Sequence, residues 1–244
     1  MESINELTIL ILFRADSVRR IYNLLAIVDY LSQFPNLKIY VREADTVNHH
    51  LLDKLLPKYV DYEFIVDRDT ILHKTSHFNN MLRNVTTPFI GIWDTDVIPY
   101  KSSFNECFDA LVEDRASIAL PYNGLCFDTS EIIADLYLQN YDFSILDQNK
   151  QMMRPLQNHR LTGGAVLMNR KDFISLGAEN ENYYGWGDDD FDRYIRFMNS
   201  GKKIFRSDTP LFHLTHPRGV NSGFSSKVYE HNSKTELSKT INNR

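Results

Sequence analysis

The first hundred residues alternate between short apolar runs and segments with helical spacing, and this alternation constrains the fold most. The apolar runs span 7–13, 37–43, 62–66 and 88–96, and the helical segments between them span 17–34, 49–56 and 73–85. Ser17 is a suitable N-cap for the first helix. Strands that alternate with helices predict an α/β fold with a Rossmann-like, mostly parallel sheet flanked by helices on both faces.

The pattern after residue 100 is looser and predicts a small second β element in the C-terminal half. We expect helices at 101–115 and 188–203, strands at 116–122 and 162–170, and short β structure within 203–219. The segment 139–160 is polar with weak periodicity, which predicts a long functional loop. These boundaries predict one domain over 1–220, with halves 1–100 and 101–220, followed by a polar, partly disordered tail at 221–244.

Composition excludes several classes of function. The 244 residues carry a net charge of -5, so no basic stripe is available for a nucleic acid. Cys107 and Cys126 form neither a disulfide framework nor a metal-binding pattern, and they suit a reducing compartment. The apolar run at 7–13 is too short to span a bilayer, and no other stretch is long enough. We expect a cytoplasmic protein, which would dock at the inner membrane face only if its partner lies there.

Charged residues follow the predicted strands at the edge where ligands collect in such sheets. Arg14 and Asp16 follow the first strand, Glu43 ends the second, and Asp94 and Asp96 end the fourth. In an extended strand the last two would point to one face, and two carboxylates there suit Mn²⁺ or Mg²⁺. The alternative is an aspartate turn that caps the strand, because Pro99 follows closely.

A second acidic segment, NYYGWGDDDFDRYIR at 182–196, combines an aromatic turn with a helix start. Trp186 lies between two glycines, and such an exposed ring can stack on a sugar. Crowded carboxylates raise one another's pKa, which suits a general base. The acids are Asp188, Asp189, Asp190 and Asp192. The alternative is a solvated, acid-rich helix N-terminus.

Two further features complete the candidate site. His213 and His216 are three residues apart, and a neutral imidazole could complete a metal site begun by Asp96. The alternative is an ordinary core or surface histidine. Gly163 and Gly164 lie within the predicted strand at 162–170 and permit close approach of the backbone.

Four segments, in this order, resemble inverting GT-A glycosyltransferases of the β-1,4-galactosyltransferase and chondroitin-polymerase type, in families 2 and 7. The segments are ILILFRADSVRR, HKTSHFNNML, FIGIWDTDVIP and LTGGAVLMNRKDF with YYGWGDDDFDRYIR. The resemblance covers about residues 7–220 and implies the GT-A fold. It also implies transfer of a galactose, N-acetylgalactosamine or glucose unit from a UDP-sugar to a saccharide or lipid-linked saccharide, with Mn²⁺ or Mg²⁺.

The resemblance also implies roles by position. Asp190 falls where the family has its catalytic base, and Asp189 falls where it has glutamate, a departure that concerns the acceptor. The implied metal ligands are Asp96 and Asp94 with His216, or alternatively His213. The implied nucleotide-binding residues are Arg14, Asp16, Glu43, Lys74, Asn79 and Asp94. The implied acceptor or sugar-binding residues are Trp186, Gly164 and Tyr184.

Other functions fit the residues less well. A nucleotidyltransferase would need a glycine-rich phosphate loop after the first strand, and FRADSVRR contains no glycine. A metal-dependent phosphohydrolase of nucleotide sugars and a non-catalytic carbohydrate-binding scaffold are the two alternatives. The segments 139–160 and HPRGVNSG (216–223) are candidates for a lid over the donor.

Overall fold

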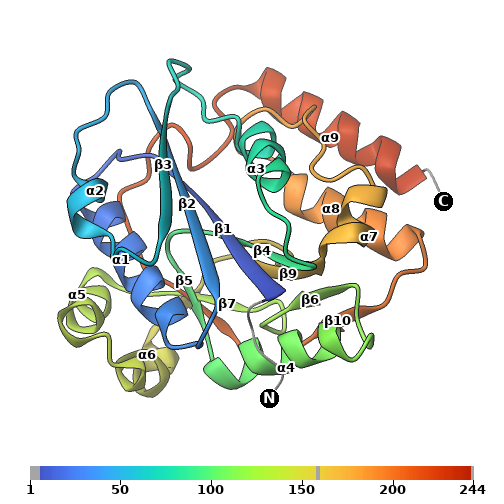
Figure 1. Ribbon diagram of the computed structural model, residues 1–244. Coiled ribbons are helices and arrows are strands. Elements are labelled where there is room, and N and C mark those ends of the chain that lie inside the picture. The colour runs from blue at the N-terminus through green and yellow to red at the C-terminus, as the bar shows by residue number, and fades with distance from the viewer. Residues whose placement is uncertain (1–5, 158–159, 243–244) are drawn as a thin grey trace.

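The computed structural model describes residues 6–157 and 160–242, and a mixed β-sheet forms its centre (Figure 1). Among these residues the sheet has seven strands, in the order β10 (Ile204–Arg206), β6 (Ile118–Leu120), β9 (Ala165–Asn169), β4 (Phe89–Trp93), β1 (Leu7–Phe13), β2 (Lys38–Asp45) and β3 (Asp61–Val66). β9 runs antiparallel to β4 and β6, and the other neighbouring pairs are parallel. The predicted α/β fold is therefore confirmed.

A second, smaller sheet confirms the β element predicted for the C-terminal half. Its strands, in order, are β5 (Val97–Pro99), β11 (Leu211–His213), β7 (Cys126–Asp128) and β8 (Arg154–Pro155). The register pairs His213 with Val97 on one side and with Asp128 on the other. Three segments that are far apart in the sequence thus meet at His213.

Helices surround the large sheet. They are α1 (Val18–Ser32), α2 (Leu52–Leu55), α3 (Lys74–Arg83), α4 (Lys101–Val112), α5 (Glu131–Asn140), α6 (Phe143–Asn149), α7 (Arg170–Ser175), α8 (Asp189–Asn199) and α9 (Lys227–Asn242), with a 3-10 turn at Lys150–Met152. The Ser17 hydroxyl accepts a hydrogen bond from the Arg20 amide, which confirms the predicted N-cap. No helix in the described part of the chain is long and apolar enough to cross a membrane.

Two segments differ from the sequence expectation. The predicted loop at 139–160 contains α6, the 3-10 turn and β8, since its apolar residues pack on the main core; for example, Leu146 is fully buried. The tail forms α9, which lies along α8 (Figure 1). Ser233 and Thr240 of α9 hydrogen-bond to acids at the start of α8. Residues 158–159 and 243–244 of these segments lie outside the described residues.

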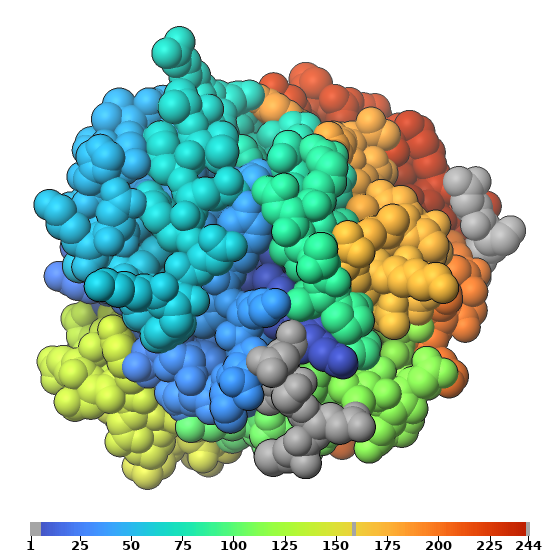
Figure 2. Space-filling view, viewed as in Figure 1, coloured from blue at the N-terminus to red at the C-terminus, as the bar shows by residue number. Residues whose placement is uncertain are grey.

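The two halves of the chain meet where α3 lies against the segment that leads into α8. Figure 2 shows α3, in green, directly beside the orange C-terminal segment. The Thr75 hydroxyl on α3 donates to the Tyr183 carbonyl at 3.0 Å, a contact between residues 108 positions apart. Residues from both halves therefore share one site.

Candidate active site

The acidic pair lies in a turn between two strands. β4 ends at Trp93, so Asp94 and Asp96 follow the strand instead of continuing it. The Trp93 indole N–H donates to the Val97 carbonyl at 3.1 Å, and the Asp94 amide donates to the Gly164 carbonyl at 2.7 Å. The prediction that both carboxylates share one face of an extended strand is therefore wrong. The turn gives each carboxylate its own set of partners.

Asp96 lies beside both histidines, and we call Asp96, His213 and His216 the aspartate–histidine cluster. Oδ2 of Asp96 is 3.2 Å from Nε2 of His216, and Oδ1 is 3.7 Å from Nε2 of His213. One ligand atom from each residue lies within 4.8 Å of the others, and all three residues are buried. The sequence favoured one histidine as a ligand, whereas the structure brings both to Asp96.

Hydrogen bonds on the far side of each ring orient this cluster. Nδ1 of His213 is 2.7 Å from Oδ1 of Asp128, and Nδ1 of His216 is 2.9 Å from the Pro217 carbonyl. Because an acceptor faces each Nδ1, the neutral ring carries its proton there and a lone pair on Nε2. Two lone pairs and a carboxylate then face one another in a buried place and repel unless a proton or a metal cation lies between them. This arrangement fits a divalent metal ion.

Arg20 on α1 is the nearest cation to this cluster among the described residues. Its Nη1 is 3.5 Å from Nε2 of His216 and 3.9 Å from Oδ2 of Asp96, and its Nη2 donates to the Thr95 hydroxyl at 3.3 Å. Burial disfavours the ionised form of Asp96, but His213, His216 and Arg20 outweigh burial and hold the pKa of Asp96 well below its usual value. Positive charge thus stabilises the ionised carboxylate.

A second cluster forms where α3 meets the start of α8; we call Lys74, Glu179, Asp189, Asp190 and Arg193 the carboxylate–cation cluster. Nζ of Lys74 is 2.9 Å from Oδ2 of Asp189 and 3.6 Å from Oδ2 of Asp190. Arg193 forms ion pairs with both Glu179 and Asp190. Two cations therefore compensate three carboxylates, and the side-chain contacts of Lys74 in this structure are with acids.

The partners of each carboxylate set its pKa. Burial raises the pKa of Asp189 to about 7, with Lys74 opposing the shift and Asp190 adding to it. Burial also raises the pKa of Asp94 to about 6, again against the pull of Lys74. Burial acts in the same direction on Asp190, but Lys74 and Arg193 outweigh it and hold the pKa of Asp190 below its usual value. The prediction that crowding raises the pKa of the base is therefore wrong for Asp190 and holds for Asp189.

The two predicted glycines connect the clusters. A Cβ atom at position 163 would lie 2.0 Å from Oδ2 of Asp190, so only glycine lets this carboxylate approach the backbone so closely. Gly164 has a φ angle of +84°, which favours glycine, and its carbonyl holds the Asp94 amide. The predicted close approach of the backbone is confirmed at Gly163. Gly163 thus contacts Asp190, and the adjacent Gly164 contacts the turn that carries Asp94 and Asp96.

Two other predicted residues, Arg14 and Glu43, lie at the carboxyl ends of β1 and β2. The Arg14 guanidinium donates to the Ala44 carbonyl at 2.8 Å and to Oδ2 of Asp67 at 2.6 Å. Glu43 is buried, and it accepts a hydrogen bond from the Tyr62 hydroxyl at 2.7 Å. Burial raises the pKa of Glu43. These residues share one edge of the sheet, as predicted, and their roles toward a nucleotide stay predictions.

Asn79 and Asp16 are engaged by protein groups. The Asn79 amide donates to the Glu179 carbonyl at 2.9 Å and to Glu181 at 2.8 Å, and its oxygen accepts from the Glu179 amide at 2.9 Å. Asn79 therefore anchors the segment that carries Glu179, and the structure does not place it in either cluster. Asp16 lies 3.4 Å from Nε of Arg20 and so faces the aspartate–histidine side.

Two aromatic residues before α8, Tyr184 and Trp186, reach the surface, whereas Tyr183 is buried. Trp186 is 40% exposed, and its ring meets Phe224 edge to face with centroids 4.9 Å apart. The Tyr184 hydroxyl donates to Asp69, and its ring lies 5.2 Å from that of Tyr229. Tyr184, Trp186 and Tyr229 line a cavity of about 60 Å³. The prediction of an exposed tryptophan is confirmed, whereas its sugar-binding role stays a prediction.

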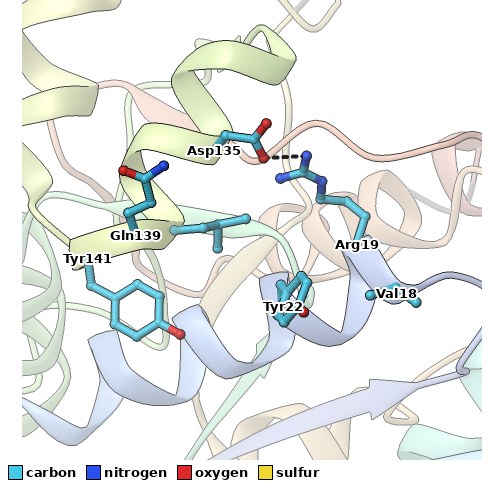
Figure 3. Close-up of a pocket in the computed structure, with 7 residues that line it drawn as sticks. Val18, Arg19, Tyr22, Asp135, Gln139 and Tyr141 are labelled. Atoms are coloured by element: carbon cyan, nitrogen blue, oxygen red, sulfur yellow. Dashed lines mark ion pairs between the residues drawn. The ribbon is translucent and has the colours of Figure 1, made fainter.

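A larger open groove, of about 460 Å³, lies between α1 and α5 (Figure 3). Its walls carry Tyr22 and Tyr141, and Arg19 bridges one end through an ion pair with Asp135 at 2.6 Å. No predicted site residue lines this groove. It is therefore separate from both clusters.

Four residues in or beside these clusters were missed by sequence reasoning. Arg193 follows Asp190 by three positions on a predicted helix, and this spacing could have indicated an ion pair. Arg20 could have been found as a cation one turn after Asp16. Asp128 and Glu179 carry no local signal, because their partners come from other parts of the chain; Asp128 and His213 are 85 positions apart.

Comparison with known proteins gives one family match and several structural matches. Residues 146–218 match the family model described as the N-terminal domain of galactosyltransferase. This stretch includes both glycines, the carboxylates of α8 and both histidines of the aspartate–histidine cluster. No curated protein matches the chain in sequence.

Three solved structures illustrate the similarity of fold. A mannosyltransferase from Pyrobaculum calidifontis, in complex with GDP-mannose and Mn²⁺, is 14% identical with a TM-score of 0.58, covering 88% of this chain and 58% of that one. A glucosyl-3-phosphoglycerate synthase from Mycobacterium tuberculosis, with Mn²⁺, UDP and its product, is 10% identical with a TM-score of 0.54, covering 86% and 72%. The catalytic domain of Drosophila β1,4-galactosyltransferase 7, with xylobiose, is 16% identical with a TM-score of 0.57, covering 98% and 81%. The comparisons confirm the predicted resemblance to GT-A glycosyltransferases.

Proposed function

We propose that the protein is a metal-dependent glycosyltransferase that transfers a sugar from a UDP-sugar to a hydroxyl group of a saccharide acceptor, with inversion. The observation that carries this proposal is the aspartate–histidine cluster beside an ionised carboxylate, Asp190, in a GT-A fold. The family match, together with the GDP-mannose and the UDP bound in two of the similar structures, supports it. Galactose, N-acetylgalactosamine and glucose are the sugar classes that we propose to test first.

Asp96, His213 and His216 would hold the metal ion. The two imidazole nitrogens favour a transition metal over Mg²⁺, and two of the similar structures contain Mn²⁺. When bound, the ion supplies positive charge that stabilises the departing diphosphate. Arg20, 3.9 Å from Asp96, offers a further cation to the same phosphates.

Asp190 is the proposed general base. Lys74 and Arg193 keep it ionised, and its side chain is 26% exposed, so an acceptor hydroxyl can reach it. As the hydroxyl oxygen attacks the anomeric carbon, Asp190 takes its proton and UDP leaves. Asp189, paired with Lys74, would fix the acceptor side of the site.

The remaining assignments extend this proposal. The nucleotide would occupy the half formed by residues 1–100, and the acceptor the half formed by 101–220. Nucleotide contacts are proposed for Arg14, Asp16, Glu43, Lys74, Asn79 and Asp94. Contacts to the acceptor or sugar are proposed for Trp186, Gly164 and Tyr184. A lipid-linked acceptor would require peripheral docking at a membrane.

A donor screen tests the proposal. Purified protein is incubated with each UDP-sugar and a set of saccharide acceptors, with Mn²⁺ or with EDTA, and product is followed by mass spectrometry. We expect transfer that requires the metal and is lost in the Asp96→Asn variant. Hydrolysis that never becomes transfer would favour a phosphohydrolase. If UDP binds equally well in EDTA by calorimetry and Asp96→Asn transfers sugar at the wild-type rate, the proposal is wrong.

A further inference from the structure

Arg193 is a buried arginine held between two carboxylates. It lies one turn after Asp190 on α8, and its side chain is 2% exposed. Nη1 pairs with Oε1 of Glu179, and Nη2 pairs with Oδ1 of Asp190. Arg196, one turn further along α8, instead pairs with Asp192 at 2.8 Å. Arg193 is therefore the arginine of α8 that contacts Asp190.

Glu179 is itself fixed from the other half of the chain. Asn79 on α3 bonds to both the amide and the carbonyl of Glu179, and the Glu179 side chain is 1% exposed. The positions of Glu179 and then Arg193 are thus set by α3. A guanidinium held on two sides has little freedom to follow a moving carboxylate.

This arrangement leaves the two oxygens of Asp190 in different environments. Oδ1 is engaged by Arg193. Oδ2 faces the Gly163 backbone and lies 3.6 Å from Lys74. Oδ2 therefore lies against the Gly163–Gly164 segment, whose second glycine accepts the hydrogen bond of the Asp94 amide.

We propose that Arg193, held by Glu179, is a positioning residue that fixes one oxygen of Asp190 and directs the other toward the acceptor hydroxyl. This inference rests on the proposed function, because it takes Asp190 as the general base. It adds a second task, which is to keep that base ionised in a partly buried site. Placement of a reacting group to within a fraction of an ångström strongly affects rate.

The charges around Asp190 predict the direction in which each variant shifts the pH dependence of kcat/KM. Those that face it, directly or through Arg193, belong to Lys74, Asp94, Tyr122, Glu179, Asp189 and Arg193. Removing the positive charge of Arg193 makes Asp190 harder to ionise, so the acid limb of kcat/KM moves to higher pH. Removing the negative charge of Glu179 strengthens the pull of Arg193, so the limb moves to lower pH.

The test uses the full chain with Mn²⁺ and the donor and acceptor found in the screen. We expect Arg193→Ala to lower kcat about tenfold to a hundredfold, with little change in KM for the donor. The acid limb of the kcat/KM–pH profile of this variant should move to higher pH by about 1–3 units. Arg193→Lys keeps the positive charge but loses the planar guanidinium that bonds to both carboxylates. It should therefore keep the acid limb near that of the wild type while kcat still falls.

Glu179→Gln is the decisive partner variant, because it keeps the shape of the side chain and should shift the acid limb in the opposite direction. Arg196→Lys serves as the matched control on the same helix and should leave the acid limb unchanged. A purely structural role for Arg193 would lower the folded fraction without opposite shifts. If Arg193→Lys and Glu179→Gln both show the wild-type pH profile and kcat, the inference is overturned.

The two levels of proposal fail differently. Should Asp190→Asn keep wild-type turnover, the assignment of the base is wrong, and the proposed function must change. Should Asp190→Asn abolish transfer while the Arg193 and Glu179 variants behave as the wild type, only the positioning role is wrong. UDP binding in the presence of Mn²⁺, measured by calorimetry, should be the same in all of these variants.

Discussion

The two clusters lie on either side of the Gly163–Gly164 segment, yet they treat charge in opposite ways. The aspartate–histidine cluster gathers acceptor atoms that face one another, and its nearest cation, Arg20, lies 3.9 Å from the carboxylate. The carboxylate–cation cluster holds three acids, but Lys74 lies 2.9 Å from Asp189, and Arg193 pairs directly with Asp190 and Glu179. The aspartate–histidine cluster is therefore suited to bind an external cation, whereas the acids of the carboxylate–cation cluster are already paired with Lys74 and Arg193.

This difference separates two functions that sequence alone merges. Acid-rich segments occur in both places, and either could have been taken for a metal site. Internal compensation makes a second metal ion at Asp189 and Asp190 unfavourable, because Lys74 and Arg193 would repel it. The same compensation holds the pKa of Asp190 below its usual value and so keeps it ionised. Under the proposed function, the metal ion would lie on one side of the glycines and the proton-accepting carboxylate on the other.

The largest effect is expected from removing the base. Asp190→Asn should lower kcat by about 10²–10⁴. Donor binding should be unchanged, because the aspartate–histidine cluster is intact. Steady-state kinetics and calorimetry with UDP and Mn²⁺ measure the two quantities separately. Loss of UDP binding along with turnover would mean that the two sides are not distinct.

The next effect concerns the residue behind His213. Asp128→Asn removes the negative charge 2.7 Å from Nδ1 while keeping a similar shape. Such partners of metal-bound histidines are worth about tenfold to a hundredfold in metal affinity, so the Mn²⁺ concentration for half-maximal activity should rise by that factor. Asp135→Asn, an exposed acid on the following helix, is the control. Equal Mn²⁺ dependence in both variants would contradict the role of His213 as a ligand.

The sheet and the first strands could be predicted because their signals are local. Strand β1 matches the apolar run at 7–13, and Ser17 caps α1 as expected. The tail and the 139–160 segment were missed because their order comes from tertiary contacts, such as the hydrogen bond of Ser233 to Asp188, which composition does not encode.

The site residues likewise divide into those that sequence motifs indicate and those that only tertiary contacts reveal. Motif spacing brought Asp96, Asp190, His213 and His216 together as candidates, and each lies in one of the two clusters. It could not reveal that Lys74 pairs with Asp189, nor that Glu179 supports Arg193, because these contacts join different elements. The pKa of Asp190 shifts downward, opposite to the prediction, because Lys74 and Arg193 contact it, and the sequence did not reveal these contacts. Charge crowding in sequence therefore predicts the place of a site better than its protonation.

A smaller effect on rate is expected where the two clusters meet. In Gly163→Ala the new methyl group would lie 2.0 Å from Oδ2 of Asp190 and must displace it. We expect kcat to fall about tenfold to a hundredfold, since a shift of about 1 Å in a reacting group can cost that much. The Mn²⁺ dependence should stay the same.

The smallest expected effect is on the pH dependence of the melting temperature. It measures how far Lys74 and Arg193 fail to balance the negative charge of the carboxylate–cation cluster. The pKa of Asp189 rises from 3.8 to about 7 in the folded chain, so folding favours its protonated form. The free energy of unfolding contributed by this group is present below pH 3.8 and is lost as the pH rises through about 7. Asp189→Asn should therefore show a smaller fall in melting temperature between pH 5 and pH 8 than the wild type, measured in EDTA. Asp114→Asn, a surface acid, should behave as the wild type. An unchanged slope in Asp189→Asn would show that Lys74 fully compensates Asp189, and the contrast between the clusters would then be larger than the pKa of Asp189 indicates.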